Sequence, residues 1–234
     1  MPNQRNRGKN SNDDQLFGAD DIQQTLKAAV ADMHYLLSRG YAERSSLQLV
    51  GNKHRLNVRQ QKAVQGMSAS EQQVKRRQAH EVAFENLNAE TIYIDGFNLL
   101  IILESALSDA YLFKGLDTTY RDLSGVHGTY KRVQQTENAL QLVGELLKDH
   151  KVIWIFDKPV SNSGRLKTLL RETAEESGFD WEIILDNNPD KLLAESEHVV
   201  VSSDAWILDR AERWLNLSAY MIEHHIPNNN IIFS

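Results

Sequence analysis

The 234-residue chain contains no cysteine, which excludes a disulfide framework, a zinc ribbon and a thiol nucleophile. No apolar run approaches the roughly 18 residues that a membrane-spanning helix needs, so we expect no membrane partner. The first residues, MPNQRNRGKNSNDDQ, lack the apolar core of a signal peptide. These absences favour a cytoplasmic protein and predict that residues 1–18 form a disordered polar tail.

Two common phosphate-binding loops are also missing. Neither the Gly-x-Gly-x-x-Gly turn of dinucleotide-binding domains nor the phosphate loop of NTPases occurs in the chain. A phosphoacceptor receiver domain needs paired acids at its first strand and a lysine after its last strand, and the sequence has neither. The sequence therefore disfavours these nucleotide-binding and phosphorelay classes.

Charge is distributed unevenly along the chain. Residues 1–90 hold 13 Lys or Arg and 10 Asp or Glu, a net of +3, whereas residues 91–234 hold 13 and 22, a net of −9. This asymmetry predicts two modules. The stretch from Arg39 to Arg77 carries nine basic residues and two acidic ones, and such a stretch can bind phosphates through counterion release. A solvated helical surface is the alternative explanation, because charged residues normally coat helices.

Residues 19–88 are predicted to form a small helical module. An apolar stripe runs from Ile22 to Leu37 and ends at Gly40. Asn57 is a plausible cap for a later helix, and Ser68 to Glu71 has capping-box spacing. Such a module could bind nucleic acid or serve as a docking platform for the rest of the chain, and its boundary is expected near residues 85–90.

Four apolar runs rich in β-formers follow, separated by helical patterns, and each ends on or within three residues of an aspartate. The runs are TIYID to Asp95, KVIWIFD to Asp157, WEIILD to Asp186 and HVVVSSD to Asp204, and IIFS at the carboxyl end is a fifth. Parallel strands need helices on both faces. We therefore predict an α/β fold over residues 91–234, a three-layer sandwich with a five-stranded, mainly parallel sheet.

The aspartates predict an acidic site, because ligands of open α/β sheets lie at the carboxyl ends of the strands. Neighbouring carboxylates repel one another, so such a cluster persists when a divalent cation neutralises it, and oxygen ligands favour Mg²⁺ or Mn²⁺. A single aspartate after a strand is more often a helix cap or a turn former. Asp186, which precedes Asn-Asn-Pro, fits that structural role.

The segment YIDGFNLL at residues 93–100 resembles the first strand and turn of the PIN-like nuclease superfamily, especially its NYN branch. The segments IFDK at 155–158 and VVVSSD at 199–204 are similar to later acidic strand ends of that superfamily, so the resemblance covers residues 91–234. The earlier segment LLSRGYAERSSLQLVGNKHRLNVRQ resembles an uncharacterised prokaryotic family in which a helical module precedes such a domain.

This resemblance implies metal-dependent hydrolysis of phosphodiester bonds, in RNA more than in DNA, with Mg²⁺ or Mn²⁺ as the cofactor. Carried over by position, Asp95, Asp157 and Asp204 are the expected catalytic residues and metal ligands, and Asp190 is a further ligand. A PIN-like scaffold that no longer cleaves, and instead binds RNA or a protein, remains the alternative. A homodimer also stays open.

A set of polar and basic side chains is predicted to contact nucleic acid: Asn98, Arg55, Arg59, Lys62, Arg121, His127, Lys131 and Arg132. Glycines beside His127 would let the backbone approach a phosphate, although a plain connecting loop has the same composition. The four tryptophans lie in strand or helix patterns and are predicted to be core residues. Glu104 and Glu137 are predicted to be solvated helical acids.

Overall fold

The computed structural model describes residues 7–124 and 129–234. The helices are α1 (Asp13–Phe17), α2 (Asp20–Ser38), α3 (Glu43–Lys53), α4 (Val58–Met67), α5 (Glu71–His80), the 3₁₀ helix η1 (Phe84–Asn86), α6 (Gly96–Leu107), α7 (Thr136–Leu146), α8 (Ser163–Ser177), α9 (Pro189–Ala194), α10 (Ala205–Leu208) and α11 (Leu217–His224). The strands are β1 (Ile92–Asp95), β2 (Leu112–Lys114), β3 (Tyr120–Arg121), β4 (Val152–Asp157), β5 (Trp181–Asp186), β6 (Val199–Val201) and β7 (Ile231–Phe233). No helix within the described residues combines the length and the apolar character needed to cross a bilayer.

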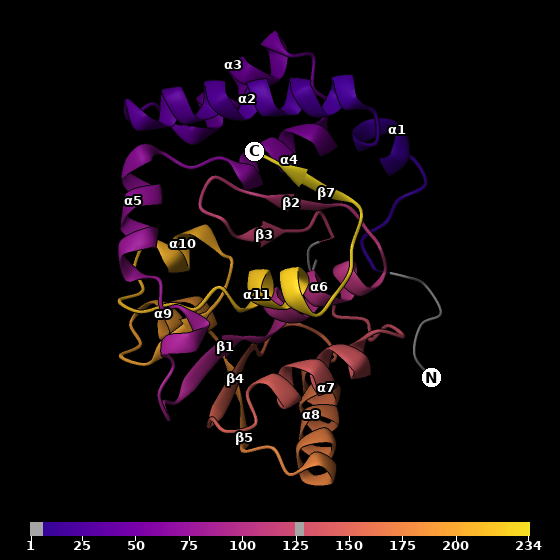
Figure 1. The fold of residues 1–234 in the computed structure, drawn as a ribbon, viewed down its shortest axis with the longest axis vertical. Helices are drawn as coiled ribbons and strands as arrows, with labels where there is room; N and C mark the ends of the chain where they lie inside the picture. The colour runs from indigo at the N-terminus through magenta and orange to yellow at the C-terminus, as the bar shows by residue number, and fades with distance from the viewer. Residues whose placement is uncertain (1–6, 125–128) are drawn as a thin grey trace.

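The main sheet has four parallel strands in the order β5-β4-β1-β6 (Figure 1). Alternate residues along each strand face opposite sides, so Ile94 and Trp154 join the core beneath α6, α7 and α8, whereas Ile155 and Val200 pack against α9 and α10. Helices therefore cover both faces of the sheet. The predicted α/β fold is confirmed.

The predicted fifth strand of that sheet is wrong. β7 pairs in parallel with β2, and β2 pairs with β3, so these strands form a separate three-stranded sheet. Ile232 of β7 is buried in a second core together with Phe113, Phe17 and the apolar side chains of α2 and α4. The strand buries its apolar side chain at this second core, and Figure 1 shows the small sheet between the upper helices and the main sheet.

The helical module has the predicted stripe, with Leu26, Val30 and Met33 of α2 fully buried. Gly40 closes the helix at φ 79°, a left-handed conformation that glycine adopts without strain. Asn57 caps α4 in a capping box, as predicted.

The cap of α5 differs from the prediction. Ser70, rather than Ser68, accepts the backbone N–H of Gln73, and the side chain of Gln73 accepts the backbone N–H of Ser70. Ser68 instead ends α4, where its hydroxyl donates to the carbonyl of Val64 at 2.7 Å. Two serines two residues apart compete for the same role, and the end of the preceding helix decides which one caps.

The described part of the predicted tail is ordered. Helix α1 places Phe17 in the second core, with its ring centroid 5.5 Å from that of Tyr111 and 4.9 Å from that of Phe113. Asp13 is buried and forms an ion pair with Arg59 at 2.6 Å. One aromatic anchor and one buried ion pair thus hold a segment whose composition alone predicted disorder.

Candidate metal centre and adjoining groove

Asp95 is the last residue of β1 and the N-cap of α6. Its Oδ1 accepts the backbone N–H of Asn98 at 3.4 Å. A Cβ on Gly96 would lie 2.2 Å from the ring of Phe156, so only glycine lets α6 begin this close to β4. The Asp-Gly pair therefore fixes both the start of the helix and the position of the carboxylate.

The ends of β1 and β6 are joined by hydrogen bonds. Ser202 donates its hydroxyl to Oδ2 of Asp95 at 2.8 Å, and the backbone N–H of Asp204 donates to the Ser202 hydroxyl at 3.0 Å. Asn98 accepts the backbone N–H of Ser203 at 2.8 Å. Ser202 and Asn98 thus hold the segment that carries Asp204 against the end of β1.

Four carboxylates gather at this edge of the main sheet. Asp95, Asp157 and Asp190 line one cavity of about 300 Å³, called the carboxylate hollow, which also includes Phe97 and Val160. Asp157 ends β4, and Asp190 lies in the first turn of α9. Asp204, the N-cap of α10, lines the groove next to this hollow.

The carboxylates influence one another electrostatically. Burial raises the pKa of Asp95 to about 7, and the charges of Asp204 and Asp190 add to this rise, while the hydrogen bond from Ser202 opposes it. Burial also raises the pKa of Asp190, as do the charges of Asp204 and Asp157. The four predicted ligands therefore share one electrostatic neighbourhood.

In the part of the chain that the structure describes, none of these four carboxylates forms an ion pair with a Lys, Arg or His side chain. Oxygen donors without cationic partners fit Mg²⁺ or Mn²⁺ by their chemistry. Their arrangement is open, since no three or more His, Cys, Asp or Glu side chains among the described residues converge closely enough to hold a metal. Asp204 also caps a helix, because its Oδ1 accepts the N–H groups of Trp206 at 2.8 Å and Ile207 at 3.1 Å.

A larger cavity of about 640 Å³ lies between part of the helical module and the α/β domain, and we call it the module groove. It is lined by residues from both sides, among them Lys62, Gln65, Gly66, Gln73, Arg77, Asn98, Arg121, Asp204, Trp206, Asp209 and Arg210. The groove leads to Asp204. A polar ligand lying in it would therefore reach the edge of the acidic cluster.

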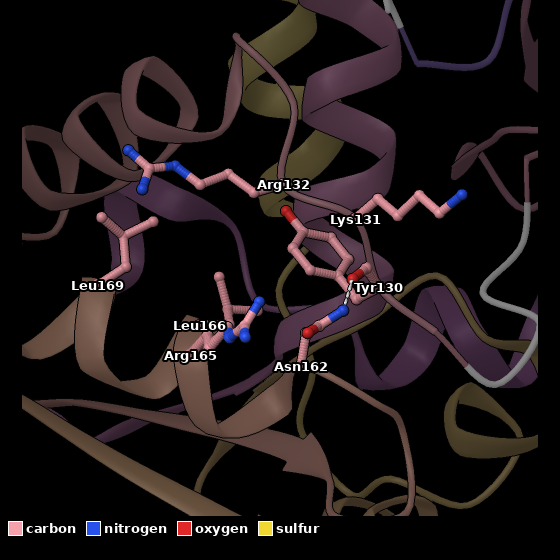
Figure 2. Close-up of a pocket in the computed structure, with 7 residues that line it drawn as sticks. All are labelled: Tyr130, Lys131, Arg132, Asn162, Arg165, Leu166 and Leu169. Carbon is pink, nitrogen blue, oxygen red and sulfur yellow. Dashed lines mark hydrogen bonds between the residues drawn. The ribbon is translucent and has the colours of Figure 1, made fainter. Parts of the chain in front are cut away.

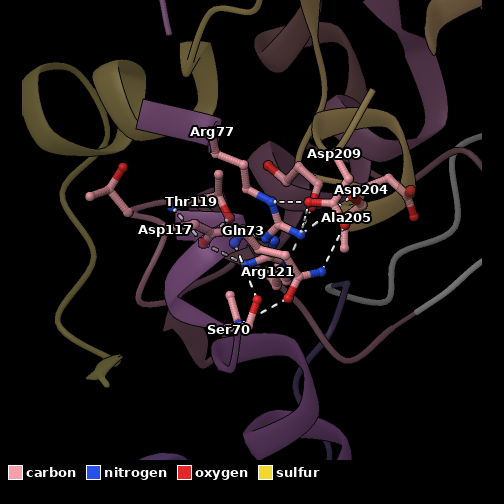
Figure 3. Close-up of polar contacts among 12 residues, drawn as sticks. Ser70, Gln73, Arg77, Asp117, Thr119, Arg121, Asp204, Ala205 and Asp209 are labelled. Atoms are coloured by element: carbon pink, nitrogen blue, oxygen red, sulfur yellow. Dashed lines mark hydrogen bonds and ion pairs between the residues drawn. The ribbon is translucent and has the colours of Figure 1, made fainter. Parts of the chain in front are cut away.

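Two arginines, the buried Arg77 and the partly buried Arg121, fix the wall of this groove (Figure 3). Arg77 of α5 forms ion pairs with Asp117 and Asp209, and its guanidinium donates to the carbonyl of Ala205 at 3.4 Å. Arg121 also pairs with Asp117 and donates to the carbonyl of Ser203 at 3.1 Å. The two guanidinium groups thus hold the carbonyls on either side of Asp204, and we call this arrangement the arginine clamp.

The clamp changes the interpretation of Arg121. Its two terminal nitrogens are both occupied by Asp117, at 2.9 and 2.7 Å, so the side chain serves the protein itself although it was predicted to contact nucleic acid. Arg59 is similarly engaged, since it pairs with Asp13 and donates to the carbonyl of Gly8 at 3.2 Å.

Of the other predicted basic contacts in the module, Lys62 is exposed and lines the module groove. Arg55 is exposed at the turn between α3 and α4, where its φ is 53°. His127 lies outside the described residues.

Lys131 and Arg132 line a separate cavity of about 490 Å³, the basic pocket (Figure 2). Its other lining residues are Tyr130, Asn162, Arg165, Leu166 and Leu169. Asn162 donates to the carbonyl of Tyr130 at 2.9 Å and so joins the two loops of the pocket, while Arg132 forms an ion pair with Glu137. The loop that carries Asn162 also carries Val160 of the carboxylate hollow, which connects the two cavities along the chain.

Residues 84–220 match the family described as "Domain of unknown function (DUF5616)". The chain belongs to this family. Residues 25–80 match the family described as "Protein of unknown function (DUF434)". The chain is also 30% identical over 204 residues to "Uncharacterized protein MJ0935" of Methanocaldococcus jannaschii, an alignment that covers 86% of this chain and 98% of that relative. No solved structure matches the chain.

The two matched segments divide the site between them. All four carboxylates lie within the segment that matches DUF5616, whereas Lys62 and Arg77 of the groove lie within the segment that matches DUF434. Neither description names an activity.

Several residues of the site were not found from the sequence. Trp206 was predicted to be a core residue, yet 44% of its surface is exposed, whereas Trp154 and Trp214 are fully buried as expected. Arg210 and Arg165 were not singled out, although each lines a cavity beside the predicted site.

Glu104, predicted to be solvated, is fully buried: it accepts hydrogen bonds from Tyr130 and Thr136 and forms an ion pair with Arg7. The run LLIILESAL, apolar on all sides, signals a buried helix and therefore a buried acid.

Proposed function

We propose that the protein is a metal-dependent nuclease that hydrolyses phosphodiester bonds in RNA, with Mg²⁺ or Mn²⁺ held among Asp95, Asp157, Asp190 and Asp204. The observation that carries this proposal is a set of four strand-end and helix-start carboxylates that influence one another and form no ion pair within the described residues. Leaving so much negative charge uncompensated is costly unless a cation is bound.

The position of the cluster in the sheet supports the same conclusion. Helix α6 leaves β1 toward the core that contains α7 and α8, whereas α10 leaves β6 toward the opposite core. Adjacent strands with connections to opposite faces create the crevice in which open α/β sheets bind their ligands. Asp95 and Asp204 stand on the two sides of that crevice.

The residues of the cluster would share the work in a defined way. Asp95, oriented by Ser202, would offer oxygen ligands to the cation together with Asp157 and the exposed Asp190. A bound divalent cation would supply a more acidic water and charge stabilisation at the phosphate. Because Oδ1 of Asp204 accepts two N–H groups of α10, Asp204 would offer the cation its other oxygen.

RNA would need positive charge near this acidic edge, since the α/β segment has a net charge of −9 over residues 91–234. Lys62 and Arg210 provide it in the module groove, and Lys131 and Arg165 provide it in the basic pocket. Contacts of this kind hold phosphates without reading sequence. An RNA strand bound in the module groove or in the basic pocket would therefore present its phosphate backbone to the carboxylate hollow.

A second candidate function is a scaffold that binds RNA or a protein without cleaving. It is favoured by one specific observation, the use of both Asp95 and Asp204 as helix N-caps, which gives each carboxylate a structural reason to exist. Under this alternative the groove binds its partner while the carboxylates only hold α6 and α10.

Cleavage of labelled RNA in Mn²⁺ and in EDTA separates the two candidates. We expect the protein to cut RNA in Mn²⁺ and not in EDTA, and we expect Asp95→Asn and Asp157→Asn each to lower the rate by about 100-fold or more while the protein stays folded. DNA of the same sequence should be cut more slowly.

Asp186→Asn is the matched control. Asp186 also ends a strand of the main sheet and is paired with Asp157 in register, but its carboxylate only accepts the backbone N–H of Asn188 at 2.7 Å, a bond that Asn can keep. This variant should cleave at nearly the rate of the unaltered protein. Full activity in the Asp95 and Asp157 variants would disprove the nuclease assignment, and RNA binding without any cleavage would favour the scaffold.

A further inference from the structure

Trp206 stands at the edge of the candidate centre with much of its ring exposed. Its exposed fraction is 44%, while the side chain of the next residue, Ile207, is fully buried. The backbone N–H of Trp206 donates to the carboxylate of Asp204, so the indole is two residues from a predicted metal ligand. Leaving this much apolar ring surface in water forgoes the free energy that its burial would contribute to folding.

Arg210 lies over this ring. Its guanidinium carbon is 4.1 Å from the ring centroid, and its Nη1 donates to the carbonyl of Trp206 at 2.9 Å. Arg210 forms no ion pair within the described residues, so its positive charge remains available. A guanidinium without an ion-pair partner in the described residues is therefore stacked on one face of an aromatic ring that is 44% exposed.

The pair separates two cavities. Trp206 and Arg210 line the module groove, and they also line a second cavity of about 560 Å³ together with Asn188, Asp190 and Lys191. Asp190 in turn lines the carboxylate hollow. A chain-like ligand that passes from the module groove through this second cavity to Asp190 would cross the indole and the guanidinium.

We propose that Trp206 and Arg210 form a stacking platform for an unpaired nucleobase, which restricts the protein to single-stranded RNA beside the carboxylates. This inference rests on the proposed function for its choice of RNA. The part of the indole that Arg210 leaves exposed can stack any base, and the guanidinium can bind the neighbouring phosphate, so the platform would select unpaired strands without selecting sequence. The bases of a duplex stack on one another and offer the platform no free face.

The test is equilibrium binding of a fluorescent 12-nucleotide RNA in EDTA, where no hydrolysis occurs. We expect Trp206→Ala to weaken binding of the single strand by about 10-fold, in line with the loss of one stacked base, and Trp206→Phe to retain most of the affinity. The RNA should also quench tryptophan fluorescence in the unaltered protein and much less in Trp206→Phe, because Trp206 is the most exposed of the four tryptophans.

Tyr35 and Arg39 supply a matched control. Tyr35 is 54% exposed, and Arg39, four residues later on α2, places its guanidinium 3.4 Å from the ring centroid, but neither residue lines the module groove. Tyr35→Ala should therefore leave RNA binding unchanged. The same RNA annealed into a duplex should bind the unaltered protein much more weakly, and single-stranded DNA tests whether the sugar matters.

Three results would overturn the platform: equal affinity of Trp206→Ala and the unaltered protein, equal affinity for duplex and single strand, or no RNA binding at all. Because the measurement excludes metal, it does not depend on cleavage. A stacking contribution in a protein that never cuts RNA would support the platform and disprove the nuclease proposal. If Trp206→Ala still cleaved RNA and bound it with full affinity, the result would support the nuclease proposal and disprove the platform.

Discussion

Asp117 is the most strongly perturbed acid of the arginine clamp. It is buried, which alone would raise its pKa, but the charges and hydrogen bonds of Arg121 and Arg77 bring the pKa below its usual value of 3.8. A carboxyl whose pKa is lower in the folded state contributes stability above its unfolded pKa and loses that contribution as the pH falls through the folded value.

We predict that Asp117→Asn destabilises the protein by about 3–5 kcal/mol at neutral pH, since the variant removes the anion that pairs with Arg121 and leaves the buried Arg77 with Asp209 alone. The free energy of unfolding of the unaltered protein should fall below about pH 4, and the difference between it and the variant should shrink over that range. Urea denaturation from pH 3 to pH 7 measures both. A difference that stays constant with pH would show that the carboxylate does not carry this contribution.

At the residue scale, the sequence predicted the positions of the strand-end acids but not the partners of single charges. Asp95, Asp157 and Asp204 could be located because each follows an apolar run, a pattern visible within a few residues. Arg59 is joined to Asp13 across 46 positions of the chain, and no local pattern pairs them. Arg121 was expected to face a phosphate but pairs with Asp117, four positions earlier. That spacing signals a contact only on a helix, and Arg121 lies in strand β3.

At the scale of elements, α4, α5 and β3 contribute basic residues with different tasks. Lys62 of α4 is exposed in the module groove, whereas Arg121 of β3 holds the backbone next to Asp204. A charge in the groove should act on the affinity for RNA. A charge in the clamp should act on the position of a metal ligand.

We therefore predict that one variant changes RNA binding and that another changes the rate of cleavage. Lys62→Glu should weaken RNA binding several-fold and reduce the slope of log affinity against log salt concentration by the amount expected for about one phosphate contact. The rate of cleavage at saturating RNA should stay nearly unchanged. Arg121→Lys loses the two-nitrogen contact with Asp117 and should lower the rate of cleavage at saturating RNA by about 10-fold with little change in binding. Arg55→Glu, exposed outside the groove, is the control for Lys62. If Arg121→Lys mainly weakened binding, Arg121 would contact RNA as the sequence suggested.

The order of most elements was predictable, but α1, β2 and β3 were not predicted, and neither was every pairing between strands. The helices of the module and the four strands of the main sheet follow from periodicity and capping residues. Strand β7 spans only Ile231–Phe233, and so short an apolar run does not specify which edge it joins. Helix α10 has only four residues, too few for a helical period to show whether Trp206 faces the core or the solvent.

At the scale of the whole molecule, the charge asymmetry and the core divide the chain in different ways. The positive net charge of residues 1–90 and the negative net charge of residues 91–234 suggested two modules. The second core nevertheless combines apolar side chains of α2 and α4 with Phe113 and Ile232 from the α/β segment. Charge patterns report what the surface can bind, while the core depends on contacts distant in sequence. The helical module is thus part of the wall of the candidate centre as well as a carrier of positive charge.

The binding of Mn²⁺ to the intact protein, measured by titration calorimetry, tests the central claim most directly. We predict that the unaltered protein and Asp186→Asn bind Mn²⁺ alike, that Asp95→Asn binds it at least about 10-fold more weakly, and that saturating metal at 100 times its Kd stabilises the fold by about 2.7 kcal/mol. Equal Mn²⁺ affinity in Asp95→Asn and the unaltered protein, or no binding at millimolar metal, would contradict a metal centre at the four carboxylates.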